Sequence, residues 1–181
     1  AQHHSSVIAD GRTFSYVVSN LDEENGDKRR IVITQNDIRQ IQLAKAALYA
    51  GIKLLMEKMN ITSLDKIKLA GAFGSHISVK HAMILGLIPD CDLKNVSSIG
   101  NAAETGARIA LLNQSDRRTI EDVVLKIEKI ETATAEKFQE HFVDAMAFPN
   151  KVDSFPLLFD FVDRPAEKVI KKLSRTRGRR N

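Results

Sequence analysis

Two glycine-containing junctions have the residue types and spacing that suit binding of a phosphate or another anion. They read Leu69-Ala70-Gly71-Ala72-Phe73-Gly74 and Ser98-Ile99-Gly100-Asn101-Ala102-Ala103-Glu104. A glycine directly after a strand permits a tight turn and lets a ligand approach the backbone closely. The amino terminus of a following helix adds free N–H groups and a positive dipole end. Each junction alone is equally consistent with an ordinary turn. The pair, at the ends of two strands separated by a helix, predicts a binding site more strongly.

The two junctions are not the best-known nucleotide loops. Gly71-Ala72-Phe73-Gly74 lacks the Gly-Lys-Ser/Thr ending of a P-loop, and it does not match the Gly-x-Gly-x-x-Gly dinucleotide fingerprint. A third element is a stripe of Gln42, Lys45 and Tyr49, which step by three and four residues along a predicted helix. The stripe offers an amide and a cation to a ligand. The alternative interpretation, which the pattern alone favours, is a solvated helix edge along which the Lys45 stem lies.

Sets of residues for other chemistry are missing from the sequence. It holds no Gly-x-Ser-x-Gly elbow, and Cys91 has no evident histidine partner, so we expect a partly buried structural cysteine. One cysteine excludes an internal disulfide, an iron–sulfur cluster and a cysteine-rich zinc site held by this chain alone. His76 and His81 are five apart, a poor match to metal ligands on a helix. We therefore predict no catalytic residue and no metal site.

Strands and helices alternate in the elements that must position these residues. We expect a hairpin of strands 14–20 and 30–33 around an Asn25-Gly26 turn. Thr34 and Asp37 then form a capping-box pair for a helix that ends near Met59, with Asn60 as its left-handed cap. The remaining elements are strands 66–70 and 96–99 and helices 78–85, 101–113, 116–126 and 134–146, with Asn101 and Glu104 as a second capping pair.

This order predicts an α/β fold with a mixed, partly parallel sheet and flanking helices. The apolar face of the long helix is expected at positions spaced by three or four, namely Ile38, Ile41, Ala44, Leu48, Ile52, Leu55 and Met59. We assign residues 1–149 to one domain. Residues 150–181 are expected to form an extended segment followed by a basic, disordered tail.

Charge and composition exclude several classes of protein. The net charge of +4 includes six cations in the last eleven residues, so the rest of the chain is slightly acidic and nucleic-acid binding is not expected. The sequence shows no membrane-length apolar run and no signal peptide, and its single cysteine does not indicate an oxidising compartment, so we expect a cytoplasmic protein. Because the first residue is Ala1, we expect a piece of a longer protein.

Several motifs, taken in order, resemble the carboxy-terminal region of the reductive activators of corrinoid proteins. They are the run Asn36–Ala47, Leu69–Gly74, Gly86-Leu87-Ile88-Pro89, Ile99–Ala103 with Gly106-Ala107, and a stretch from Phe142 that ends Ala-Met-Ala-Phe-Pro. The resemblance covers residues 30 to 150. This family includes the activators of methylamine methyltransferase corrinoid proteins of methanogens and is similar to actin, the heat-shock chaperones and the acetate and sugar kinases.

The resemblance implies an actin-like, ribonuclease H-like half-domain that binds ATP with Mg²⁺ in a cleft between two halves. It implies a parent protein that reduces Co(II) corrinoid proteins to Co(I) for methyl transfer, with an iron–sulfur cluster outside this chain. By the same resemblance Gly71, Ala72, Phe73 and Gly74 contact adenosine, Gln42 and Lys45 flank the adenine or ribose, and Gly100 and Asn101 lie near the same cleft. The expected partners are a corrinoid protein and the missing N-terminal half, and a homodimer is possible.

The sequence departs from that family pattern because the first half of the cleft, with its phosphate loops, is absent. Catalysis of phosphoryl transfer needs groups on both sides of the transferred phosphoryl group, so we expect little ATP hydrolysis from this chain alone. Two alternatives remain open: a non-catalytic module that dimerises or docks a corrinoid protein, and half of a small-molecule kinase. All three interpretations share one fold, so the fold does not decide between them.

Overall fold

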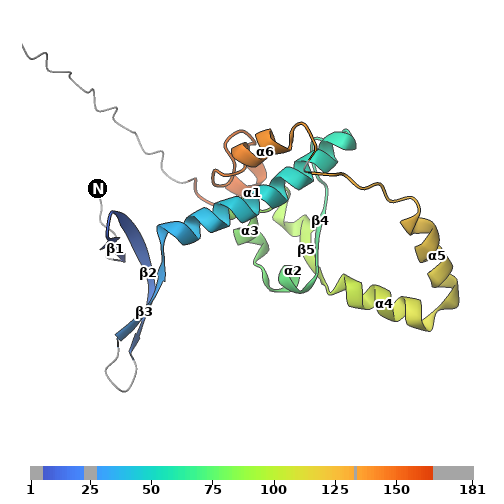
Figure 1. Cartoon of the computed structure of the whole chain (residues 1–181), viewed down its shortest axis with the longest axis horizontal. Coiled ribbons are helices and arrows are strands. Elements are labelled where there is room, and N and C mark those ends of the chain that lie inside the picture. Colours follow the sequence, from blue (N-terminus) through green and yellow to red (C-terminus); the bar gives the residue numbers. More distant parts are fainter. Residues whose placement is uncertain (1–5, 23–27, 133, 165–181) are drawn as a thin grey trace, which may run out of the picture.

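The computed structural model describes residues 6–22, 28–132 and 134–164 (Figure 1). The long helix α1 (Gln35–Lys58) runs from a small antiparallel sheet at one end to the α/β body, and the helix pair α4–α5 projects from the body on the other side. No helix of the described residues is long and apolar enough to cross a membrane.

The first sheet is antiparallel with the order β1-β2-β3, formed by β1 (Val7–Asp10), β2 (Thr13–Asp22) and β3 (Lys28–Ile33). Gly11, at φ +59°, lies in the tight β1–β2 turn. The predicted hairpin is confirmed as β2 and β3, with an irregularity in register between Val17 and Ser19. Strand β1 was not predicted, and the Asn25-Gly26 turn lies outside the described residues.

Helix α1 begins at the predicted capping box. The Asp37 amide donates to Thr34 Oγ1 at 3.2 Å, and the Thr34 amide donates to Asp37 Oδ2 at 2.8 Å. These hydrogen bonds hold the pKa of Asp37 below its usual value, because they favour the carboxylate. Asn60 follows the helix in a left-handed conformation, at φ +55°, as predicted. Local sequence therefore determines both ends of α1.

The predicted apolar face of α1 is not the face that packs into the body. The buried residues of the helix are Lys45, Ala46, Tyr49, Ala50 and Met56. Leu48 and Leu55, which we expected inside, are 49% and 52% exposed. The prediction was wrong because Lys45 and Tyr49 find buried hydrogen-bond partners in the segment 147–153, and such partners remove most of the cost of burying polar groups.

The second sheet is a parallel pair, β4 (Ile67–Ala70) and β5 (Val96–Gly100). The connection contains α2 (Ala72–His76), α3 (Val79–Leu85) and a 3-10 turn at Leu93–Asn95. Gly86 ends α3 in a left-handed conformation at φ +71°, as its position after the helix predicts. The mixed strand directions match the α/β prediction, although the strands form two separate sheets.

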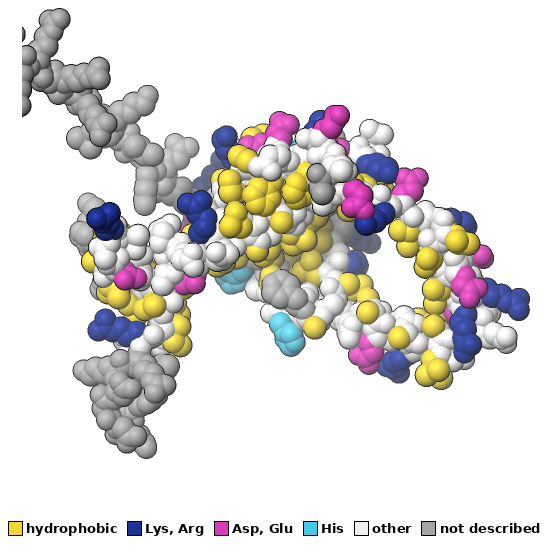
Figure 2. Space-filling model, viewed as in Figure 1, with side chains coloured by type: hydrophobic (Ala, Val, Ile, Leu, Met, Phe, Trp, Pro, Cys, Tyr) yellow, Lys and Arg dark blue, Asp and Glu magenta, His cyan; other side chains and the backbone are white. Residues whose placement is uncertain are grey.

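The remaining helices are α4 (Ala102–Leu112), α5 (Gln114–Val124), α6 (Phe138–Asp144) and the short α7 (Pro156–Phe159). Helix α6 begins later than predicted, and α7 lies where we expected only extended chain. No residue of α4 or α5 is buried. On the face shown in Figure 2, apolar side chains gather over α1 and along the projecting α4–α5 pair.

The core lies between α1, the second sheet, α3 and the segment after α6. Its buried apolar members are Ala46, Tyr49, Ala82, Met83, Ile88, Cys91, Val96, Ala145, Phe155 and Leu158. Cys91 is fully buried, where only partial burial was expected, and burial raises the pKa of its thiol. The core thus packs against the second sheet, which carries both glycine junctions.

Candidate functional site

The first junction is a tight turn between β4 and α2. Gly71 directly follows β4 with φ +97°, a conformation that residues with a side chain rarely adopt. The carbonyl oxygen of Gly71 accepts from the amide of Ser75 at 3.1 Å and from its hydroxyl at 3.0 Å. The turn is therefore fixed by its own backbone and by one serine.

The second junction lies at the end of the neighbouring strand. Gly100 ends β5 at φ +71°, and Asn101 caps α4 by accepting from the Glu104 amide at 3.3 Å. The Gly71 amide donates to the Gly100 carbonyl at 2.8 Å, so the two junctions are in direct contact. The predicted juxtaposition follows from the parallel pairing of β4 and β5, which brings both carboxyl ends to one edge.

The glycines of this edge differ in what surrounds them. A Cβ atom added at Gly71 or Gly100 would meet no heavy atom within 4 Å, whereas one at Gly74 would lie 3.1 Å from the backbone and Cβ of Leu69. Gly71 and Gly100 therefore present open backbone, and Gly74 is needed for close packing on β4. The side chain of Phe73 lies outside the described part of the chain, so its predicted contact with adenosine is not tested.

An apolar cavity of about 260 Å³ lies beside β4. Its lining comes from α1, β4 and the α2–α3 region, namely Leu48, Lys68, Leu69, Ala70, Gly74, Ile77, Ala82, Leu87 and Ile88. Lys68 donates to Ser97 Oγ at 2.7 Å across the two strands. The glycine edge thus adjoins a cavity suited to an apolar or planar group.

Gln42 and Lys45, the other predicted site residues, bind the chain's own backbone. Gln42 Nε2 donates to the Met146 carbonyl at 3.0 Å. Lys45 Nζ donates to the carbonyls of Ala147 and Pro149, the latter at 2.7 Å. Among the described residues neither side chain bonds to 71–74 or to 100–101. The structure therefore brings the two glycine junctions together and does not bring this stripe to them.

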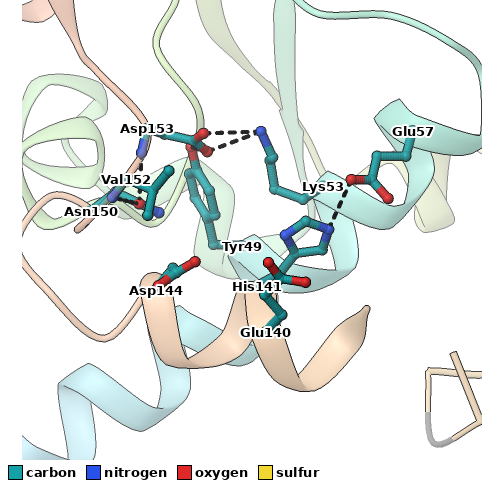
Figure 3. Close-up of a pocket in the computed structure, with 9 residues that line it drawn as sticks. All are labelled: Tyr49, Lys53, Glu57, Glu140, His141, Asp144, Asn150, Val152 and Asp153. Atoms are coloured by element: carbon teal, nitrogen blue, oxygen red, sulfur yellow. Dashed lines mark hydrogen bonds and ion pairs between the residues drawn. The ribbon is translucent and has the colours of Figure 1, made fainter. Parts of the chain in front are cut away.

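A charged pocket on the other side of α1 was not predicted (Figure 3). It has a volume of about 140 Å³ and is lined by Tyr49, Lys53, Glu57, Glu140, His141, Asp144, Asn150, Val152 and Asp153. Asp153 accepts from Tyr49 at 2.7 Å and pairs with Lys53 at 3.0 Å. His141 Nε2 lies 3.1 Å from Glu57.

The groups in this pocket mostly satisfy one another. Burial raises the pKa of Tyr49, and the neighbouring Asp153 raises it further. Burial alone would raise the pKa of Glu57, but His141 and Lys137 together hold it below its usual value. The spacing of Tyr49 and Lys53 on α1 signals only a shared face. Their partner, about a hundred residues away, leaves no local signal in the sequence.

The described residues contain no group of three histidine, cysteine or carboxylate side chains placed to hold a metal ion. The single cysteine, Cys91, is buried. An iron–sulfur cluster therefore does not fit the thiols of this chain. A nucleotide fits better at the glycine edge, because a phosphate or ribose can approach open left-handed glycines beside a helix amino terminus.

Comparison with known proteins gives concordant results. Residues 1–159 match the family described as the C-terminal domain of RACo, the ASKHA domain. A corrinoid activation enzyme of Eubacterium limosum, RamQ, is 40% identical over 131 residues, which are 71% of this chain and 22% of that protein. A solved structure titled reductive activator for corrinoid, iron-sulfur protein is similar with a TM-score of 0.68 and 28% identity over 80% of this chain and 23% of that one. The chain thus spans less than a quarter of the length of these relatives.

Proposed function

Since this chain belongs to the family of the RACo C-terminal ASKHA domain, we propose that it forms one wall of a nucleotide site in an ATP-dependent activator of corrinoid proteins. The observation that carries this proposal is the contact between the two open glycine turns, with Gly71 N bonded to Gly100 O at 2.8 Å. Two half-buried glycine backbones with open space beside them, next to the first turn of α4, suit the ribose and phosphates of ATP.

In this proposal Gly71, Ala72, Phe73 and Gly74 contact adenosine. Gly100 and Asn101 border the phosphates, and the bound Mg²⁺ would be held by the nucleotide and by groups outside this chain. Gln42 and Lys45 are the weaker part of the assignment. A ligand that took the Lys45 ammonium would first have to displace the carbonyls of Ala147 and Pro149.

The parent protein, in our proposal, uses ATP to drive reduction of a Co(II) corrinoid protein to Co(I), so that the corrinoid can accept a methyl group. The names of the similar proteins refer to corrinoid activation, which supports a corrinoid protein as the partner. The electron would come through an iron–sulfur cluster elsewhere in the parent, since this chain offers one buried thiol.

A second role, docking or dimerisation, is favoured by one observation. Helices α4 and α5 have no buried residue, and Leu112 and Leu125 are 81% and 85% exposed. A projecting helix pair with this much exposed apolar surface is typical of an interaction site. We propose that the pair contacts another part of the parent or a partner protein, in addition to the nucleotide role.

Calorimetric titration of ATP and ADP with Mg²⁺ tests the nucleotide role. We expect binding by the intact chain, and loss of binding in Gly71→Val, whose side chain would fill the space left for the ligand. Gly11→Val is the matched control, because Gly11 is also left-handed, at φ +59°, with no atom within 4 Å of an added Cβ. Equal affinities for intact chain and Gly71→Val, or no binding at millimolar nucleotide, would contradict the proposal.

A further inference from the structure

Lys45 is an unusual residue of α1, because among the described residues it is the only charged side chain that is fully buried. Its ammonium lies against the segment 146–158, which we call the strap. The strap follows α6, runs along α1 and buries Phe155 and Leu158 in the core. Lys45 therefore holds two parts of the chain together from inside the protein.

The Lys45 ammonium is surrounded by backbone carbonyl dipoles and one aromatic ring. Its hydrogen bonds go to the strap carbonyls of Ala147 and Pro149, and the Phe148 ring centre lies 4.9 Å away. No carboxylate of the described residues pairs with it. A buried ammonium without a counter-charge is costly, and carbonyl dipoles offset only part of that cost.

The titratable groups on the neighbouring elements have partners of their own. Six such groups have partners among the described residues, namely Tyr49 and Lys53 on α1, His141 and Asp144 on α6, Asp153 on the strap and Asp90 after α3. Asp153 binds Tyr49 and Lys53, and His141 pairs with Glu57. Asp144 lies 3.7 Å from Lys151, and Asp90 accepts two strap amides at 2.9 Å. Lys45 itself is buried and has no carboxylate partner among the described residues.

We propose that Lys45 is a protonation-dependent latch, which binds the strap to α1 more tightly as the neutral amine than as the ammonium. The neutral amine keeps two N–H groups, enough for the two carbonyls that it contacts. Loss of the third proton therefore removes the buried charge and costs no hydrogen bond to the strap. The inference stands on the contacts of Lys45 and does not depend on the nucleotide site.

The direction of the pH effect follows from linkage. Burial lowers the pKa of Lys45 from 10.5 to about 8 when the strap is closed. An open strap exposes the amine and restores its pKa to 10.5. At any pH between about 8 and 10.5 the open state therefore binds more protons than the closed state. Closure must therefore strengthen as pH rises through that window. From these values the closing equilibrium should increase roughly 20-fold between about pH 7.5 and 9.5.

Hydrogen exchange of the strap amides, corrected for the intrinsic pH dependence of exchange, tests the latch on the full chain. We expect protection of residues 150–158 to rise about 20-fold over that range. Lys45→Met should abolish the rise. Lys53→Met is the matched control, because it also removes a strap contact, to Asp153, from a side chain that is 25% exposed. It should lower protection at every pH and keep the rise.

A second measurement on the unaltered protein covers the case in which Lys45→Met does not fold. The ¹³Cε resonance of one lysine should titrate near pH 8. The proposal is overturned if no lysine resonance titrates near pH 8. It is also overturned if Lys45→Met folds and its strap protection retains the pH dependence of the unaltered chain.

Discussion

Replacement of Gly86 by alanine perturbs the junction between α3, α1 and the strap at one point. Gly86 ends α3 at φ +71°. An added Cβ would lie 1.9 Å from the Pro149 oxygen and 3.1 Å from Lys45 Nζ. The Pro149 carbonyl is backbone and cannot rotate away, so the strap itself would have to shift.

Two costs contribute to the expected loss of stability. The left-handed conformation costs a residue with a Cβ about 1–2 kcal/mol. A shift of the strap breaks the 2.7 Å bond between Lys45 and Pro149, and a hydrogen bond to a charged group is worth about 1.5–3 kcal/mol. We therefore expect Gly86→Ala to lower the free energy of unfolding by about 2.5–5 kcal/mol.

Urea denaturation followed by circular dichroism measures this loss, and Gly11→Ala is its control. Gly11 has a similar φ of +59°, but an added Cβ there meets no atom within 4 Å. Gly11→Ala should therefore show only the conformational cost of about 1–2 kcal/mol. Equal losses in the two variants would refute the reasoning, because they would show that the contact between Gly86 and Pro149 carries no energy of its own.

Three further predictions concern helix ends and ion pairs. Asp90→Ala should lower the free energy of unfolding by about 1–3 kcal/mol, because two amides at 157–158 lose their acceptor, and denaturation checks this. Asn113→Ala should cost about 1 kcal/mol, because its side chain caps α5, and hydrogen exchange should localise the loss to α5. Glu57→Gln should reduce the loss of unfolding free energy that occurs as the pH is lowered. The lowered pKa of Glu57 gives stability that is present above its unfolded pKa and is lost as pH falls through its folded pKa. If the loss of stability at acid pH were the same in Glu57→Gln as in the unaltered chain, the ion pair with His141 would be contradicted.

Features that depend on neighbours in the sequence were predicted correctly. The Thr34–Asp37 capping box and the Asn101 cap follow from side chains that reach backbone groups three residues away. The left-handed Asn60 follows from the tolerance of asparagine for that conformation after a helix. The pairing of the two glycine turns was also predictable, because alternating strands and helices favour parallel strands whose carboxyl ends meet.

The buried face of α1 was not predictable in the same way. Periodicity identifies an apolar stripe, but it does not show which stripe the rest of the chain covers. Lys45 and Tyr49 are buried because carbonyls and a carboxylate about a hundred residues later accept their hydrogen bonds. The stripe that contains Leu48 and Leu55 stays half exposed in this chain, which spans less than a quarter of its relatives.

The proposal of a nucleotide wall is tested most directly by titrating ATP and Mg²⁺ into ¹⁵N-labelled chain and following each amide resonance. We predict that the largest saturable shifts lie at residues 70–76 and 99–105, on both sides of the Gly71–Gly100 contact. Shifts confined to the charged pocket around Asp153, or no saturable shift at millimolar nucleotide, would contradict the account.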